Sequence, residues 1–219
     1  MSDKPKLTYW PIRGLAAPIR AALIYSDIAF TDDRTTAWYD GISEEIAKVN
    51  PLCNNPCLTL PSGQVICQSW AVLQYVGRQG PLKPANDLEQ IRVDEVIGVL
   101  QEFFTEKMKA SYPKEAKENI PSFITESCGY YLDVLEKYMT INGTSFLATA
   151  QPSIVDIFLT EQLDGVVLKM APGESAGLMA KFPKVFGIYA AMKANPKLQA
   201  FYEAEKDVPF NSAAYAAWW

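Results

Sequence analysis

The hydrophobic and polar positions in the N-terminal part of the chain predict a small α/β unit. An apolar segment over 7–11 predicts a strand, and apolar residues at helical spacing predict a helix over 16–26. Residues 27–32 then predict a turn into a second short strand. A β-α-β order of this length favours a parallel pair of strands joined by a crossover helix.

The next part of this unit has a different order. Residues 57–60 and 65–67 predict two strands on either side of a turn over 61–64, which together form a β-hairpin. Gln68-Ser69 opens the helix that follows, with Ser69 placed as its N-cap. The expected order is therefore β-α-β followed by β-β-α, a complete thioredoxin-like α/β unit.

The pattern changes after residue 81. Gly80 and the prolines at positions 81 and 84 interrupt the helix and mark a linker. Beyond it no strand is convincing, and apolar residues at helical spacing predict helices over 87–110, 120–138, 153–170 and 182–194. The predicted domains are an α/β domain over 1–81, a linker over 82–86 and an all-helical domain over 87–219.

The amino-acid composition then limits the kinds of catalytic and metal site that the chain can form. The chain has 219 residues and no histidine, which excludes Ser-His-Asp and Cys-His machinery and the H-E-x-x-H metal motif. Its four cysteines, Cys53, Cys57, Cys67 and Cys128, match neither a disulfide framework nor a zinc-finger spacing, so we expect no metal. Any catalysis must rest on tyrosine, cysteine, carboxylates, lysine, arginine or backbone groups.

Net charge and hydropathy limit the kinds of partner and the cellular compartment that we expect. The net charge of -5 argues mildly against a nucleic-acid partner, which would favour a basic face. No apolar run approaches the roughly 18 residues that suggest a membrane span. The polar N-terminus lacks the apolar core of a signal peptide. We therefore expect a cytoplasmic protein with no membrane partner.

A polar-tipped aromatic residue, Tyr9, stands where the first strand gives way to the first helix. In open α/β sheets, ligands usually bind outside the carboxyl ends of the strands. A tyrosine hydroxyl, with an ordinary pKa of about 10, can donate a hydrogen bond to an anion at neutral pH. A tyrosine at a strand end is more often a core residue whose hydroxyl reaches the surface, so this position alone leaves both interpretations open.

Motifs that follow one another at the expected intervals resemble the cytosolic glutathione S-transferases, and most closely the mu, sigma, pi and alpha classes, which use a tyrosine. The motifs are Tyr9-Trp10-Pro11-Ile12-Arg13-Gly14, Asn55-Pro56 before an apolar strand, Gln68-Ser69 at a helix start, and Ser153-Ile154-Val155-Asp156. The resemblance runs from near residue 6 to about residue 200. It implies a detoxifying homodimer that uses glutathione as co-substrate and needs no cofactor. We expect Ser153–Asp156 to be a capping box with no role in the site.

The resemblance also implies roles for residues around glutathione. The hydroxyl of Tyr9 would stabilise the glutathione thiolate, because a hydrogen bond to the charged form lowers the pKa of a thiol. Asn55-Pro56 would be cis and present the backbone of Asn55 to the cysteine of the tripeptide. Gln68 and Ser69, at a helix N-terminus, would hold the γ-glutamyl carboxylate. The other expected contacts are Trp10, Arg13 supporting the Tyr9 loop, Trp38 and Lys48 near the glycine carboxylate, Asn54, and Glu102 of the partner subunit.

The second substrate would be a hydrophobic electrophile in an apolar cleft between the domains, lined by Trp10, Met108, Tyr112 and Trp219. The chain departs from the family pattern at the acidic residue that reaches across the dimer interface to glutathione. Gly98 stands where pi and sigma forms carry that acid, and Glu102, one turn further, resembles the mu placement. Two alternatives to a transferase stay open: a glutathione-dependent isomerase, as some sigma-class relatives are, and a non-catalytic binding or structural protein.

Overall fold

The computed structural model describes residues 3–111 and 116–211, which form two compact units. The first unit combines residues 3–83 with 196–211, and the second lies within 84–195. The boundary falls inside the predicted linker. The division differs from the expected one because helix α10 (Pro196–Glu205) and residues 206–211 belong to the first unit.

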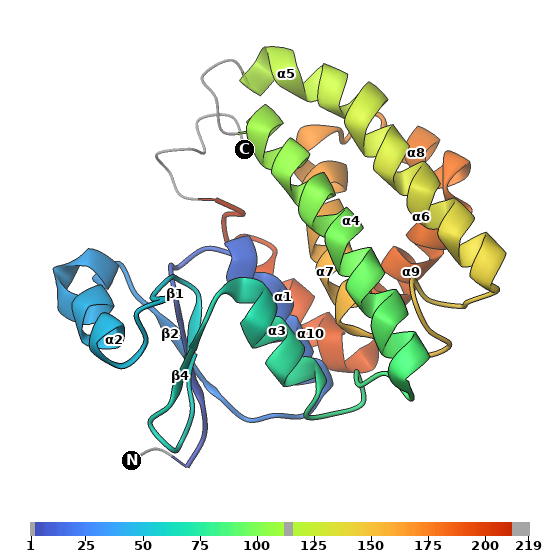
Figure 1. Ribbon diagram of the computed structural model, residues 1–219. Helices are drawn as coiled ribbons and strands as arrows, with labels where there is room; N and C mark the ends of the chain where they lie inside the picture. The colour runs from blue at the N-terminus through green and yellow to red at the C-terminus, as the bar shows by residue number, and fades with distance from the viewer. Residues whose placement is uncertain (1–2, 112–115, 212–219) are drawn as a thin grey trace. The chain divides into compact units, whose positions relative to one another are not determined.

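A four-stranded mixed sheet forms the centre of the first unit (Figure 1). Strand β1 (Lys6–Tyr9) pairs in parallel with β2 (Thr31–Arg34) and antiparallel with β3 (Cys57–Thr59), which pairs with β4 (Val65–Cys67). The strand order is β2-β1-β3-β4. The parallel opening pair and the later hairpin are both confirmed.

Helices connect and cover these strands. A 3-10 turn η1 (Gly14–Ala16) and helix α1 (Ala17–Tyr25) form the crossover between β1 and β2, and α3 (Ser69–Gly77) follows β4. Ser26 is the C-cap of α1, the next residue Asp27 is left-handed with φ 54°, and pairing of β2 begins at Thr31. Between β2 and β3 lie a π-helical segment η2 (Trp38–Ile42) and helix α2 (Ser43–Val49).

The two faces of the sheet pack against different elements, because side chains alternate along a strand. Leu7 and Leu58 are register partners with no exposed surface, on the face that α1 and α3 cover. Cys57 points to the opposite face, where it forms a buried cluster with Trp38 and Cys67. Each face of this small sheet therefore has its own apolar packing.

The second unit is helical throughout its described residues. Figure 1 shows α4 and α6 as its long green and yellow helices. The elements are α4 (Asp87–Ser111), α5 (Ala116–Ser122), η3 (Phe123–Cys128), α6 (Gly129–Asn142), α7 (Ile154–Gly165), η4 (Val166–Met170), α8 (Ser175–Lys181) and α9 (Pro183–Ala194). The predicted helices are present, and α8 was not predicted because it buries no side chain and so carries no apolar stripe.

Helix α7 is the core of this unit, since every one of its residues is buried. It begins with the predicted capping box: the Asp156 carboxylate accepts hydrogen bonds from the Ser153 backbone N–H at 2.8 Å and from the Ser153 hydroxyl at 2.9 Å. The Leu147 N–H donates to the other carboxylate oxygen at 2.8 Å. Burial raises the pKa of Asp156 to about 6, against the lowering effect of these bonds.

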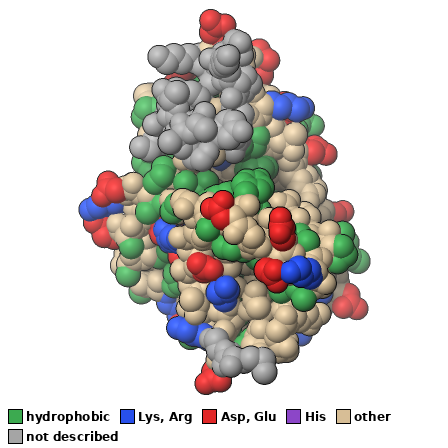
Figure 2. All heavy atoms as spheres, turned by 90° about the vertical axis from the view of Figure 1, so that its left-hand side faces the viewer, with side chains coloured by type: hydrophobic (Ala, Val, Ile, Leu, Met, Phe, Trp, Pro, Cys, Tyr) green, Lys and Arg blue, Asp and Glu red, His purple; other side chains and the backbone are tan. Residues whose placement is uncertain are grey.

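Surface composition is mixed. On the face drawn in Figure 2, acidic and basic side chains are interspersed with hydrophobic ones rather than gathered into a patch of one sign. Within the described residues, no helix is both long and apolar enough to cross a membrane.

Candidate functional site

The strand register brings three separate motifs to one end of the sheet. Thr8 of β1, Cys57 of β3 and Cys67 of β4 form a row of partners across the three strands. β1 ends one residue beyond this row, β4 ends at the row, and β3 begins at it. The next residues beyond the row are therefore the ones that the motifs contain: Tyr9, Pro56 and Gln68.

Tyr9 is fixed at this sheet end by the turn that follows it. Its side chain is 6% exposed, and its hydroxyl oxygen accepts a hydrogen bond from the Leu15 N–H at 3.1 Å. That bond uses an oxygen lone pair, so it does not consume the hydroxyl proton. Gly14 makes the approach possible: it has φ +40°, and a Cβ there would lie 2.5 Å from the Tyr9 hydroxyl oxygen.

Arg13 supports the same turn from the buried side. Its side chain is 2% exposed, and its guanidinium carbon lies 4.0 Å from the centre of the Phe210 ring. The backbone N–H groups of Arg13 and Gly14 donate to the carbonyls of Pro209 and Phe210 at 2.8 and 3.1 Å. The segment after α10 therefore holds the Tyr9 turn in place. Sequence reasoning missed Phe210 and Leu15, because no local pattern marks them.

The Asn55-Pro56 bond is cis, as the resemblance implies. The Asn55 backbone N–H donates to the Asn54 side-chain oxygen at 2.8 Å. The amide nitrogen and oxygen of the Asn55 side chain are both buried and have no hydrogen-bond partner among the described residues. Buried polar atoms are rarely left in that state, so a ligand is one source of their partners.

The turn from β4 into α3, which we call the Gln68 corner, differs from the expectation for the start of this helix. Helix α3 begins at Ser69, so Gln68 is its N-cap and the prediction that Ser69 is the N-cap was wrong. The reason is backbone conformation: Gln68 has φ 74° and ψ 118°, outside the helical region, whereas Ser69 is already helical. The Gln68 side-chain amide donates to the Leu52 carbonyl at 3.3 Å, which ties this corner to the loop before Asn55.

The residues expected near the glycine carboxylate lie in two different environments. Trp38 is 5% exposed and belongs to the Cys57 and Cys67 cluster, against which Trp10 also packs. Lys48 is exposed and forms an ion pair with Glu45 one turn earlier on α2. The structure therefore gives Trp38 a packing role, and its role toward glutathione stays a prediction.

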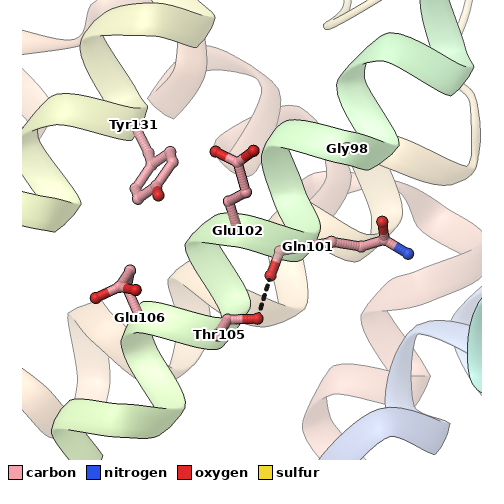
Figure 3. A pocket seen from close by; sticks show the side chains of 6 residues that line it. All are labelled: Gly98, Gln101, Glu102, Thr105, Glu106 and Tyr131. Atoms are coloured by element: carbon pink, nitrogen blue, oxygen red, sulfur yellow. Dashed lines mark hydrogen bonds between the residues drawn. The ribbon is translucent and has the colours of Figure 1, made fainter.

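In the second unit, Glu102 lines a surface hollow of about 340 Å³ on α4. Figure 3 shows Glu102, Glu106 and Tyr131 around this hollow, with Gly98 one turn away on the same helix. Burial raises the pKa of Tyr131, and the nearby charges of Glu102 and Glu106 add to this. Glu102 is exposed, and its role toward a partner subunit stays a prediction.

The remaining predictions concern the electrophile site and metals. Met108 is half-buried on α4, while Tyr112 and Trp219 lie outside the described residues. Across residues 3–111 and 116–211, no group of three or more cysteine, aspartate or glutamate side chains is arranged to hold a metal ion.

Comparisons with known proteins agree on one family. A family model described as "Glutathione S-transferase, C-terminal domain" matches residues 99–205. Glutathione S-transferase 2 of Onchocerca volvulus is 32% identical over 203 residues, which cover 90% of this chain and 91% of the relative. Glutathione S-transferase of Tyrophagus putrescentiae is 28% identical over 223 residues, which cover 96% and 95%.

Solved structures give the same result. The Pi-class glutathione S-transferase of Onchocerca volvulus superposes with a TM-score of 0.84 at 28% identity, covering 97% of this chain and 99% of that one. Prostaglandin synthase D of Nilaparvata lugens superposes with a TM-score of 0.76 at 24% identity, covering 92% and 98%. The second likeness shows a shared fold alone.

Proposed function

Because this chain belongs to the cytosolic glutathione S-transferase family, we propose that it conjugates glutathione to hydrophobic electrophiles with Tyr9 as its catalytic residue. The observation that carries the proposal is the position of Tyr9, Pro56 and Gln68 beyond one row of the sheet, with the Tyr9 hydroxyl held by the Leu15 N–H. These groups suit a tripeptide that carries a thiol and two carboxylates.

The chemistry follows from the hydroxyl. The glutathione thiol has an ordinary pKa of about 8.5 and becomes nucleophilic when it loses its proton. A hydrogen bond donated by Tyr9 favours the thiolate, at about 1.4 kcal/mol for each unit of pKa. The sulfur then forms a bond to the electrophilic carbon, and the leaving group departs with the electron pair of the bond that breaks. This scheme needs neither histidine nor a metal.

The other ends of the tripeptide have matching groups. The backbone N–H groups at the start of α3 and the dipole of that helix favour the γ-glutamyl carboxylate beside Gln68 and Ser69. Asn55 supplies backbone and side-chain polar atoms next to the cysteine of the tripeptide. We further propose a cytoplasmic homodimer in which Glu102 of one subunit reaches the γ-glutamyl amine bound by the other.

The test is retention on glutathione resin followed by an assay with a generic aryl halide. A transferase is retained and consumes glutathione and the halide in equal amounts. A glutathione-dependent isomerase is retained and rearranges a hydrophobic substrate without consuming glutathione. Retention without turnover of either kind supports a binding protein, and a chain that is not retained contradicts both enzymatic functions.

A further inference from the structure

Helix α1 contains a charged side chain, Arg20, in the middle of an otherwise apolar buried stretch. Arg20 is 1% exposed, and its neighbours Ile19 and Ala21 have no exposed surface. Burying a charge is costly, and replacing a buried ion pair by well-packed apolar residues often leaves a protein equally or more stable. The stability of the fold alone therefore does not explain an arginine at this position.

The hydrogen bonds of Arg20 reach in two directions. On one side, its Nε donates to the two carboxylate oxygens of Asp32 on the edge strand β2, at 3.0 and 3.1 Å. On the other side, its Nη1 donates to the Ile12 carbonyl at 2.9 Å. Ile12 lies in the turn between Tyr9 and Leu15, whose N–H donates to the Tyr9 hydroxyl oxygen. Arg20 therefore ties that turn to the edge strand of the sheet.

Arg20 also lies over the ring of Tyr9. Side chains alternate along β1, so Tyr9 is on the same face of the sheet as Leu7, which α1 and α3 cover. The guanidinium carbon of Arg20 lies 5.9 Å from the centre of the Tyr9 ring. This is within the about 6 Å at which a cation is attracted to an aromatic face. One buried side chain thus holds both the Tyr9 ring and the turn beside its hydroxyl.

The charges around Arg20 balance one another. Asp32 also accepts a hydrogen bond from the Arg34 Nε at 2.6 Å, and Arg34 donates to Glu205 on α10. Helix α10 packs on α1, as Figure 1 shows. Two cations facing two carboxylates produce only a weak field at a distance, so the contribution of Arg20 is its geometry. A planar guanidinium donates in two fixed directions, which a lysine ammonium does not reproduce.

We propose that Arg20 is a positioning residue for conjugation, which fixes the Tyr9 ring and its turn so that the hydroxyl points at the glutathione sulfur. This inference rests on the proposed function of Tyr9. Arg20 is buried and acts through Tyr9 rather than on either substrate. Misplacing a group by about 1 Å can cost about 100-fold in rate, so such a role has a measurable effect.

Arg20→Lys tests this role, because lysine keeps the charge but loses the two-directional fork. We expect kcat with an aryl halide to fall about tenfold and the pKa of the bound glutathione thiol to rise toward about 8.5. The KM for glutathione should change less than about twofold, since the lost interaction belongs to the transition state. A merely structural arginine would alter the free energy of unfolding and leave the kcat and thiol pKa of the folded protein unchanged.

Arg34→Lys is the matched control, because Arg34 belongs to the same group of charges. Within residues 3–111 and 116–211, its side chain donates hydrogen bonds to Asp32 and Glu205 and none to the Tyr9 turn. This variant should keep the kcat and thiol pKa of the wild type. An equal loss of kcat in the two arginine variants would show that the ion pairs, and not the contacts with Tyr9, are responsible, and would overturn the proposal.

Combining Arg20→Lys with Tyr9→Phe separates this inference from the proposed function. If Arg20 acts through the Tyr9 hydroxyl, Arg20→Lys should cost no further activity in the Tyr9→Phe chain. A tenfold loss in both backgrounds overturns the role of Arg20 and leaves Tyr9 catalytic. A Tyr9→Phe chain with full turnover instead overturns the proposed function, and this inference with it.

Asp32→Asn provides the same test if Arg20→Lys does not fold. It removes the charge that anchors the Arg20 Nε, so kcat should fall about threefold in the wild-type background and not at all in Tyr9→Phe. Asp33→Asn is its matched control, because Asp33 is the next residue of β2 and pairs with Lys6 instead. Wild-type kcat and thiol pKa in folded Asp32→Asn, or an equal loss in Asp33→Asn, would overturn the proposal.

Discussion

Two helix N-termini in this protein differ in how their first backbone N–H groups find hydrogen-bond partners. The first N–H groups of any helix lack partners inside the helix. At the start of α7, the buried Asp156 carboxylate accepts bonds from Ser153 and Leu147, all from within the chain. At the start of α3, Gln68 has a strained backbone and its side chain makes no capping bond. The first start is capped by side chains of the fold, and at the second we propose that the γ-glutamyl carboxylate of glutathione takes the place of a side-chain cap.

This difference separates folding from binding. Asp156 has no exposed surface, so its bonds serve the core of the second unit. Gln68 is exposed and has φ 74°, a conformation that costs a residue other than glycine about 1–3 kcal/mol. Changes at the first start should therefore alter stability, and changes at the second should alter glutathione binding.

The largest expected effect concerns Asp156 and pH. Burial raises the pKa of Asp156 to about 6 from 3.8. At pH values between these two, the folded state therefore keeps a proton that the unfolded state releases. The associated stability is fully present below about pH 4 and is lost as the pH rises through 6. Relative to Asp156→Asn, the wild type should lose about 3 kcal/mol of unfolding free energy between pH 4 and 7.

Urea denaturation of both proteins at several pH values measures this loss. The Michaelis constant for glutathione should be the same in the two proteins, because the capping box lies away from the site. A difference in unfolding free energy that does not change with pH contradicts the account of α7.

The next effect concerns the turn that holds Tyr9. A Cβ at Gly14 would lie 2.5 Å from the Tyr9 hydroxyl oxygen, so Gly14→Ala should displace that hydroxyl. We expect kcat/KM for conjugation to fall about 30-fold, or about 2 kcal/mol. Gly63→Ala is the matched control: it also has positive φ, but nothing lies within 4 Å of the added Cβ.

Steady-state kinetics of both variants separate crowding from backbone strain. Gly63→Ala should lose about 1 kcal/mol of stability and keep its activity. If the two variants lose activity equally, crowding of Tyr9 is not the cause.

The smallest effect concerns strain at Gln68. Glycine adopts a positive φ without strain, and this gain should exceed the cost of its greater conformational entropy in the unfolded chain. Gln68→Gly should therefore be about 1 kcal/mol more stable than Gln68→Ala. Both variants lose the side chain, so both should bind glutathione more weakly. Thermal denaturation together with glutathione titration checks this pair, and a Gln68→Gly chain less stable than Gln68→Ala argues against strain at this corner.

Local patterns were sufficient to predict much of the fold. The strand and helix order of the first unit, the hairpin and the capping box each depend on residues close together in sequence. Helix α10 was not predicted, and its residues were placed in the helical domain, because its packing on α1 joins segments far apart in the chain. The contact of Arg13 with Phe210 could not be predicted either, because these two residues are also far apart in the sequence.

The candidate site was predicted less completely. The resemblance found Tyr9, Asn55-Pro56 and the Gln68 corner, and the register places them at one sheet end. It did not find the positive φ of Gln68, because a glutamine carries no signal for that conformation. It also did not find the buried cluster that Trp38 forms with Cys57 and Cys67, because that cluster joins segments far apart in the sequence.

The central claim is that the Tyr9 hydroxyl stabilises the glutathione thiolate, and titration of that thiolate by its ultraviolet absorbance in the enzyme complex tests it most directly. In Tyr9→Phe, the pKa of the bound thiol should rise toward about 8.5, and kcat should fall about 10- to 100-fold while glutathione affinity is kept. A Tyr9→Phe protein with the thiol pKa and turnover of the wild type would contradict the claim.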